Sequence, residues 1–216
     1  MRDPFVTKNI LKWYDLNKRS LPWRKNVSKE KRHYNTLISE FMLQQTQVAT
    51  VIPYFNKFVK EIPNIKKLAS VDNKKLIKLW EGLGYYSRAR NLKKAAQSVI
   101  KNFNGVIPDN FDDLKSLSGI GDYTANAILA IAFNKPYIPL DGNVERIIKR
   151  YLYLKKEKEI QKENLIEKKS ILGFSNRSSD YAQALMEFGA LVCKPTNPLC
   201  CCLLYTSPSP RDVCSS

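Results

Sequence analysis

The chain has 216 residues, 44% of them hydrophobic, which is enough for one good core or two small lobes. Lysine and arginine number 36 against 20 acidic residues, a net charge of +16 that favours a polyanionic partner over a merely soluble basic protein. No apolar run approaches the ~20 residues that span a bilayer, and no apolar signal core follows Met1, so we expect a cytoplasmic protein without a membrane partner.

Apolar residues recur at helical spacing along most of the chain, and no stretch alternates as a strand does. The fold class is therefore predicted to be all-α. The expected helices cover residues 5–17, two within 36–61, then 73–81, 86–102, 111–117, 122–133, 143–154, 158–171 and 177–193.

A short turn carries two glycines, Gly119 and Gly121, between the helices predicted at 111–117 and 122–133. Glycine lets bare backbone N–H groups approach a phosphate, and the start of a helix favours an anion. Asp141 follows about 20 residues later, ahead of another helix. An acid held near a bound phosphate can act on the sugar, so this stretch predicts chemistry on nucleic acid.

Two carboxyl groups are candidates for that chemistry. Glu40 lies among Leu37, Phe41 and Met42, and burial would raise the pKa of such a carboxyl and keep a proton available. The alternative is a surface glutamate on an amphipathic helix. Asp141 could serve only as a helix N-cap, a role compatible with remaining ionised. One protonated and one ionised acid are what cleavage of a glycosidic bond requires.

Amides and aromatic residues on predicted loops could insert into a base stack. Gln44 and Gln45 follow the helix that carries Glu40, and Tyr85 follows a glycine pair. Core packing is the alternative for the tyrosine. Arg88 could contact phosphates beside Tyr85, or belong to a solvated helix face.

All five cysteines lie after residue 192, which favours one local metal site over a distributed disulfide framework. From about Cys201 onward the chain is rich in serine and proline and resembles a translated sequencing adapter. We therefore expect residues 202–216 to be a non-native or disordered tail.

These residues resemble the helix-hairpin-helix DNA glycosylase superfamily, and within it the adenine DNA glycosylases, over about residues 8–201. The resemblance rests on six motifs: Leu21–Arg24, Ser39–Phe55, Trp80–Leu92, Leu117–Ala125, Leu140–Val144 and Gln183–Cys193. It implies two lobes, a six-helix barrel at 29–135 with the hairpin at about 111–133, and a second helical lobe from 1–28 plus 136–201 that ends in an iron–sulfur loop.

The resemblance also implies catalytic roles. Glu40 would protonate the departing adenine, Asp141 would stabilise the sugar cation, and Asn143 would orient water or Asp141. Tyr123 occupies the position where endonuclease III has the lysine that forms a Schiff base. A phenol cannot form that imine, so we expect hydrolysis without lyase activity.

Binding roles follow from the same resemblance. Gln45 and Tyr85 would form the wedge in the duplex, with Gln44 and Arg88 also contacting DNA. The extruded adenine would be lined by Trp23, Arg24 and Glu187, and the phosphate backbone would be contacted by Gly119 and Gly121.

Three departures from the family pattern stand out. Ser118 replaces the usual hairpin proline, and residues 26–33 read as a longer, more basic loop in which His33 is a surface residue. A 4Fe–4S cluster is expected for the family, but only Cys193 and Cys200 match its spacing. Residues 203 and 209 are not cysteine, and Cys202 is out of register, so a complete cluster is doubtful here. The family's C-terminal domain, which reads 8-oxoguanine, is expected to be absent.

We therefore predict a monomeric, nucleoid-associated enzyme of base excision repair that removes adenine from mispairs with 8-oxoguanine or guanine in double-stranded DNA. One alternative is an endonuclease III-like glycosylase and lyase acting on oxidised pyrimidines. The other is a non-catalytic helix-hairpin-helix DNA-binding module, for which two acids near the sugar would have no use.

Overall fold

The computed structural model describes residues 4–154 and 172–199, and every regular element in those ranges is helical. The all-α prediction is therefore confirmed for this part of the chain. The helix expected at 158–171 and the tail expected at 202–216 lie outside the described residues. No helix in the described ranges combines the length and apolar character needed to cross a membrane. The chain divides into unit 1, residues 1–18 with 138–216, and unit 2, residues 19–137.

Unit 2 is built from seven α-helices and one 3₁₀ turn, and its core is a single cluster of apolar side chains. The elements are η1 (Pro22–Arg24), α2 (Lys29–Leu43), α3 (Val48–Glu61), α4 (Ile65–Ser70), α5 (Asn73–Trp80), α6 (Ser87–Asn102), α7 (Phe111–Ser116) and α8 (Asp122–Ile131).

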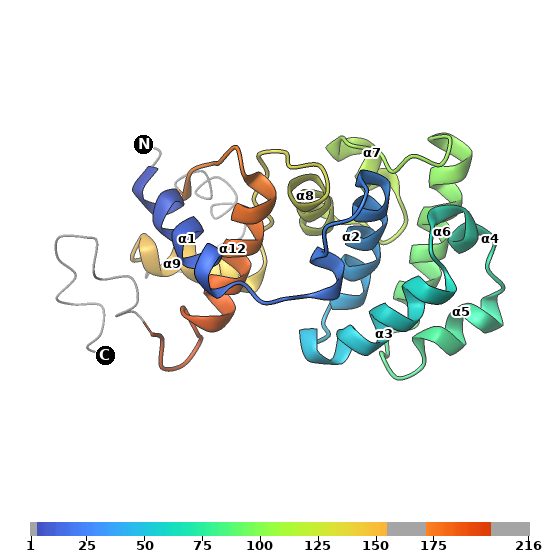
Figure 1. The fold of residues 1–216 in the computed structure, drawn as a ribbon, viewed down its shortest axis with the longest axis horizontal. Helices are drawn as coiled ribbons and strands as arrows, with labels where there is room; N and C mark the ends of the chain where they lie inside the picture. Colours follow the sequence, from blue (N-terminus) through green and yellow to red (C-terminus); the bar gives the residue numbers. More distant parts are fainter. Residues whose placement is uncertain (1–3, 155–171, 200–216) are drawn as a thin grey trace. The chain divides into compact units, whose positions relative to one another are not determined.

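Helix α2 forms the centre of this unit. All nine residues from Tyr34 to Met42 are buried, so the helix is covered on every side rather than along one stripe. It packs against α3, α6, α8 and η1, and Figure 1 shows it between α8 and α3. The apolar run that surrounds Glu40 in the sequence is therefore the middle of the core.

The boundary between the two units differs from the prediction. Residues 19–28 were assigned to the lobe that contains the chain ends, but they belong to unit 2. The reason is that Leu21 and Trp23 are buried in its core, where the Trp23 ring packs edge-on against Phe55 at 5.3 Å between centroids. These contacts anchor η1 to α2 and α3.

Two helical segments were missed. Helix α2 begins at Lys29, not in the middle thirties, because the Ser28 hydroxyl accepts a hydrogen bond from Lys31 N. His33 consequently lies on a helix, half-buried against Phe133 at 4.1 Å between centroids. Helix α4 is a six-residue element capped by Asn64, and it is too short to show a period in the sequence.

The turn between α7 and α8 forms the predicted hairpin. Gly119 adopts a φ of +81°, and a Cβ built there would lie 2.8 Å from Asn91 Cβ and 2.9 Å from Phe41 Cε1. The Ser118 hydroxyl is hydrogen-bonded to Asn91 Oδ1 at 3.1 Å, so the turn is also tied to α6. Glycine is required at 119 for both its backbone conformation and its lack of a side chain.

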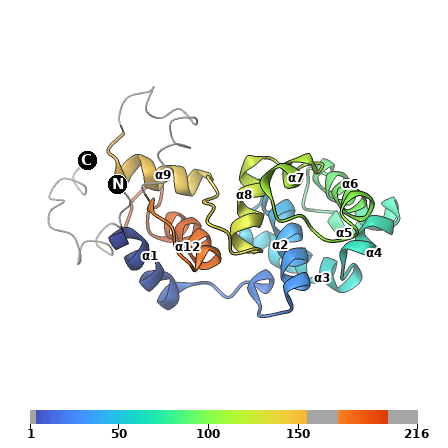
Figure 2. The same ribbon diagram turned by 90° about the horizontal axis from the view of Figure 1, so that it is seen from above.

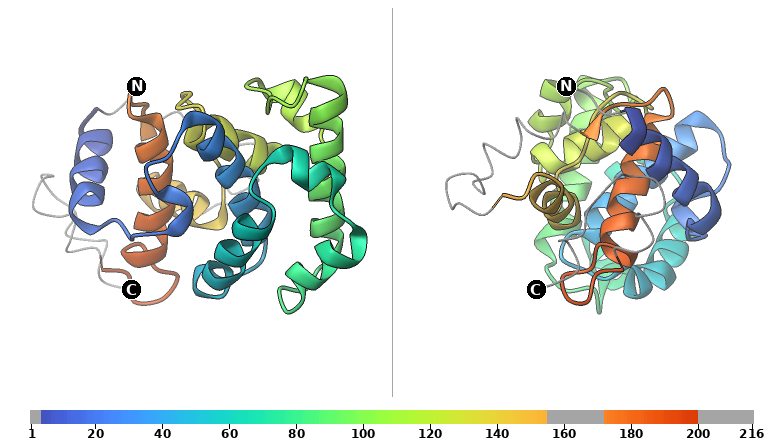
Figure 3. Two further views of the ribbon diagram at one scale, coloured as in Figure 1. Left: turned by 45° about the vertical axis from the view of Figure 1, so that its right-hand side comes forward. Right: turned by 90° about the vertical axis from the view of Figure 1, so that its left-hand side faces the viewer.

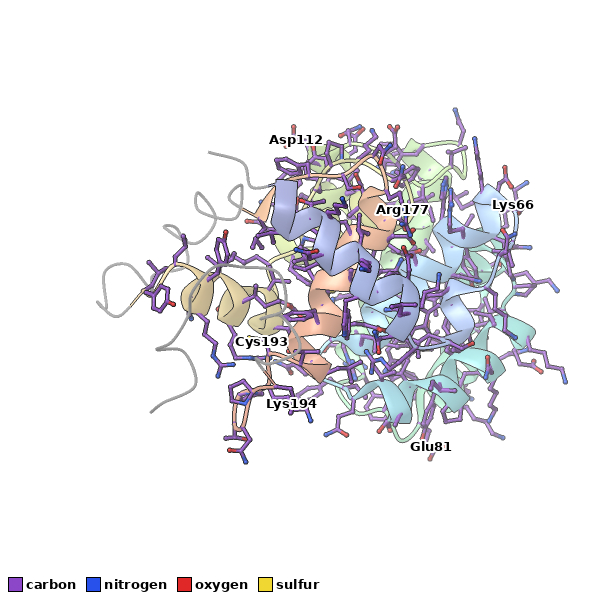
Figure 4. The ribbon with its side chains drawn as sticks, turned by 60° about the vertical axis from the view of Figure 1, so that its left-hand side comes forward. Lys66, Glu81, Asp112, Arg177, Cys193 and Lys194 are labelled. Atoms are coloured by element: carbon purple, nitrogen blue, oxygen red, sulfur yellow. The ribbon has the colours of Figure 1, made fainter. Side chains whose placement is uncertain are left out.

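Unit 1 contains α1 (Pro4–Asn17), α9 (Gly142–Tyr151) and α12 (Ser178–Leu191) in its described part. Helix α12 packs against both of the others, as Figures 2 and 3 show from three directions. Trp13 and Phe188 meet edge to face at 5.3 Å in the core. Arg177 donates two hydrogen bonds to Asp15, which joins the start of α12 to α1 (Figure 4).

The two hairpin glycines should respond differently to alanine. Gly119→Ala forces a left-handed backbone on a residue with a Cβ and crowds Asn91 and Phe41, so we expect it to lower the free energy of unfolding by about 2 kcal/mol or more. Gly121 has φ −95°, and a Cβ added to it would have nothing within 4 Å, so Gly121→Ala is the matched control. Urea unfolding of both variants measures the difference, and equal destabilisation would contradict the crowding argument.

Candidate functional site

Glu40 lies on the central helix α2, one turn before its C-terminal end, and its exposed fraction is 5%. The alternative that it is a surface glutamate is therefore wrong. Leu37 and Phe41 beside it are fully buried. A carboxyl group in such a place is shielded from bulk water, which is the environment that suits a proton donor.

The end of α2 is tied to the hairpin through Gln44. Its Nε2 lies 3.5 Å from the Gly119 carbonyl oxygen and 3.4 Å from Thr124 Oγ1, which is in the first turn of α8. The helix that carries Glu40 is thus joined directly to the turn that carries the glycines. The amide of Gln44, predicted to contact DNA, is engaged within the protein.

Gln45 and Tyr85 are exposed residues with the same unusual backbone conformation. Their φ angles are +55° and +46°, in the left-handed region that costs a residue with a side chain about 1–2 kcal/mol. The Tyr85 side chain is 64% exposed, so the alternative of core packing is wrong for it. Strained backbone of this kind is often found where a side chain contacts a partner. The same conformation is adopted by Asn104, Asn134, Tyr153 and Asn197, which are also exposed.

Arg88 requires a correction. It was predicted to contact DNA, but it is only 7% exposed, and its guanidinium donates hydrogen bonds inside the protein. Burial lowers the pKa of this group, and the charge is compensated by carbonyl oxygens rather than by an acid. A guanidinium used in this way is not available to a phosphate.

The hairpin presents backbone donors at the start of α8. Gly119 and Gly121 are both exposed, and the N-cap residue Gly121 provides no side chain to cap the helix. The first N–H groups of a helix lack intrahelical partners, so they can bind an anion. Tyr123 is half-buried in the first turn of the same helix.

In unit 1, Asp141 is the N-cap of α9. Its Oδ1 accepts a hydrogen bond from Val144 N at 2.7 Å, and its Oδ2 accepts one from Asn143 Nδ2 at 2.9 Å. Burial raises the pKa of Asp141 above its usual 3.8, although these hydrogen bonds and the charge of Arg146 act in the opposite direction. The carboxylate is thus oriented by its own helix.

Sequence reasoning missed two arginines on α9. Arg146 donates to Asn143 Oδ1 at 2.7 Å and to the carbonyl oxygens of Gly189 and Cys193, both at 2.6 Å. Arg150 donates to Cys193 Sγ at 3.3 Å and to Lys194 O at 2.7 Å. Their i, i+4 spacing just after Asp141 was the available signal, since it places both on one helix face.

Helices α12 and α9 approach each other closely at one point. A Cβ built on Gly189 would lie 2.5 Å from Asn143 Cβ, so only glycine allows this approach. Glu187, two residues before Gly189 on α12, is 1% exposed. Glu187 was predicted to line the extruded adenine together with Trp23 and Arg24. Those two residues belong to η1 in unit 2, where Trp23 is a core residue.

The predicted residues therefore form two groups. Unit 2 brings together the segment Glu40–Gln45, the hairpin glycines and the loop of Tyr85. Unit 1 brings together Asp141, Asn143 and the segment after α12. Each group is defined by contacts within its own unit.

Cys193 is the one cysteine in the part of the chain that the structure describes, and Figure 4 shows it just past the end of α12. Cys200 and Cys202 lie outside the described residues. Across residues 4–154 and 172–199, no three acid, histidine or cysteine side chains gather as metal ligands. A 4Fe–4S cluster is held by four thiolates, and all the cysteines other than Cys193 lie outside the described residues.

The chain is similar in sequence to adenine DNA glycosylases over most of its length. The chain is 42% identical to the adenine DNA glycosylase of Rattus norvegicus over 200 residues, which cover 89% of this chain and 39% of that protein. It is 43% identical to the adenine DNA glycosylase of Buchnera aphidicola (subspecies Acyrthosiphon pisum) over 197 residues, 88% of this chain and 54% of that protein. The chain thus spans about half, or less, of the length of these relatives.

Solved structures share the fold. A thermostable thymine-DNA glycosylase superposes with a TM-score of 0.79 at 27% identity, covering 90% of this chain and 88% of its own. Endonuclease III in a non-covalent complex with DNA superposes with a TM-score of 0.73 at 22% identity, covering 94% of this chain and 90% of its own.

The family described as HhH-GPD superfamily base excision DNA repair protein matches residues 38–172. That range begins on α2 just before Glu40 and includes the loop of Tyr85, the hairpin, Asp141 and Asn143. With its helical fold and the identity to curated members, this match shows that the chain belongs to the HhH-GPD superfamily of base excision DNA repair proteins.

Proposed function

We propose that this chain is the catalytic core of a monofunctional adenine DNA glycosylase. The observation that carries the proposal is identity of 42–43% to adenine DNA glycosylases across almost nine-tenths of the chain. The two carboxyl groups support it, because one is buried on the central helix and the other caps the start of α9, which orients it. The substrate is an adenine opposite 8-oxoguanine or guanine in duplex DNA.

The reaction breaks the bond between C1′ of the sugar and N9 of adenine. The bonding electrons leave with the base, so a proton delivered to the base assists departure, and Glu40 is the donor. The sugar becomes an oxocarbenium-like cation, which the Asp141 carboxylate stabilises. Asn143, hydrogen-bonded to Asp141, orients that carboxylate or the water that adds to C1′. The water adds to C1′ and gives up one proton to the solvent, from which Glu40 is protonated again, and an abasic site and free adenine remain.

The base must leave the stack before it reacts, because the glycosidic bond is inaccessible in duplex DNA. Gln45 and Tyr85 suit a wedge that fills the space left by the base, since both are exposed on fixed backbone. The exposed hairpin N–H groups hold the phosphate backbone. A mispaired adenine costs less to extrude than a paired one, which contributes to selectivity.

No step of this reaction passes through an iron–sulfur cluster. Cys193 is positioned by Arg146 and Arg150, and it matches the first cysteine of the family spacing. Cys193 and Cys200 are the two cysteines in the family register, so we infer that the sequence supplies half of a four-thiolate site.

Replacing the proton donor should slow base release severely. Glu40→Gln keeps the size of the side chain but cannot protonate adenine, so we expect excision to fall by about 10²–10⁴, with duplex binding retained. The matched control is Glu30→Gln, an exposed glutamate in the first turn of the same helix. Single-turnover release of adenine opposite 8-oxoguanine, with binding measured by fluorescence anisotropy, tests the assignment. Full activity of Glu40→Gln contradicts it.

The abasic product should remain uncleaved. Because the half-buried side chain at 123 is a phenol and forms no imine, strand breaks should appear only after alkali treatment. The measurement is gel electrophoresis of a labelled duplex with adenine opposite 8-oxoguanine, with and without alkali. Breaks without alkali would indicate the endonuclease III-like glycosylase and lyase. Tight binding without base release would indicate a DNA-binding module.

Asp141 should make stability depend on pH. Its folded-state pKa is raised above 3.8, so the folded chain takes up this proton more readily than the unfolded chain. The contribution of Asp141 to the free energy of unfolding therefore rises as pH falls from the raised pKa toward 3.8. Asp141→Asn keeps a capping oxygen but lacks this titration. Urea unfolding between about pH 7 and pH 4 should show wild type gaining stability relative to the variant; a constant difference contradicts the shift.

A further inference from the structure

Arg88 connects two loops that are some forty residues apart in the sequence. Its Nη1 donates to the carbonyl oxygens of Phe41 and Met42 at 3.3 and 2.9 Å. The carbonyl oxygen of Gln44 and Thr46 Oγ1, the latter at 3.1 Å, are also within hydrogen-bond distance of this nitrogen, so its two N–H hydrogens are shared among four acceptors. One guanidinium nitrogen therefore binds the whole segment in which α2 ends.

The other terminal nitrogen binds the second loop. Arg88 Nη2 donates to Leu83 O at 2.9 Å and to Gly84 O at 3.2 Å, and the backbone N–H of Arg88 donates to Tyr85 O at 2.9 Å. The guanidinium carbon lies 5.7 Å from the ring centroids of both Tyr85 and Trp80. The side chain is thus fixed by aromatic rings as well as by carbonyl oxygens.

In each of the two loops, Arg88 binds the carbonyl oxygen of the residue that directly precedes an exposed one. Gln44 directly precedes Gln45, and Gly84 directly precedes Tyr85. Gln45 and Tyr85 are both exposed and both adopt a left-handed conformation. A hydrogen bond to the carbonyl of the preceding residue fixes the peptide plane that leads into the exposed one. The two terminal nitrogens of the planar Arg88 guanidinium therefore fix the peptide planes before Gln45 and Tyr85 together.

We propose that Arg88 is a positioning residue that sets Gln45 and Tyr85 as one rigid, two-pronged wedge for extruding the target base. The wedge role of the two prongs rests on the proposed function, whereas the bracing of the loops does not. Lysine cannot replace arginine here, because an ammonium is one donor centre and cannot reach both loops as a planar fork does.

The first experiment measures the brace without DNA. In Arg88→Lys, backbone hydrogen exchange should accelerate about tenfold in peptides covering 43–47 and 82–87, and little elsewhere in unit 2. Thr46→Val, which removes one acceptor and leaves the arginine in place, should accelerate exchange mainly in 43–47. Arg90→Lys is the matched control, since Arg90 is exposed on the same helix. Unchanged exchange in both peptides overturns the proposal, and so does an equal increase throughout unit 2.

The second experiment measures extrusion with 2-aminopurine, a fluorescent adenine analogue, placed opposite guanine in a duplex. The fluorescence gain on binding should fall at least about fivefold in Arg88→Lys and stay unchanged in Arg90→Lys. Binding to a duplex with a tetrahydrofuran abasic analogue, which needs no extrusion, should change less than about threefold. Equal loss of binding to both duplexes overturns the wedge role.

The two proposals fail separately. Absence of adenine release by the wild-type chain overturns the proposed function and leaves the hydrogen-exchange result standing. Wild-type release of adenine, with Arg88→Lys matching it in rate, exchange and fluorescence, overturns the role of Arg88 alone.

Discussion

The burial of α2 on every side between Tyr34 and Met42 is the constraint on which the rest of unit 2 depends. A helix that is buried all round can neither rotate nor slide without exposing its neighbours to water. Glu40 lies within the buried stretch of that helix, one turn before its C-terminal end, so its direction is set by packing rather than by loop geometry. The same constraint fixes where α2 ends, and therefore where Gln44 meets the hairpin. The packing that forms the core of unit 2 therefore also positions the candidate site residues of this unit.

The two carboxyl groups are held by contrasting means. Glu40 is fixed by the surrounding core, whereas Asp141 is fixed by hydrogen bonds within the first turn of α9. The first arrangement excludes water and the second orients an anion at the positive end of a helix dipole. Two ordinary features of helical proteins, a buried helix and an N-cap, thus hold the two carboxyl groups, and burial also raises the pKa of Asp141.

The sequence allowed the fold class and most helices to be predicted, because apolar spacing reports on burial. For Glu40 the neighbouring residues alone favoured a surface position on an amphipathic helix, and its buried catalytic role was implied only by the family resemblance. The sequence did not reveal α4, which is shorter than two turns, or the start of α2, where a polar stretch is made helical by the Ser28 cap. Arg88 was misassigned for a deeper reason. An arginine beside exposed tyrosines suggests a surface residue, and its burial depends on carbonyl oxygens supplied by a distant helix end. Such tertiary acceptors leave no local pattern.

Gly189 has a consequence for how variants of this chain should be judged. Glycine within a helix normally lowers helix propensity, so alanine at this position would count as a mild improvement by local criteria. Its methyl group, however, would occupy the space of Asn143 Cβ. The neighbour to be displaced, Asn143, donates a hydrogen bond to Asp141, so a single methyl group would couple a gain in helix propensity to the loss of that hydrogen bond. Substitution scores based on residue similarity would miss such a position, because what matters there is the volume that the glycine leaves to its neighbour.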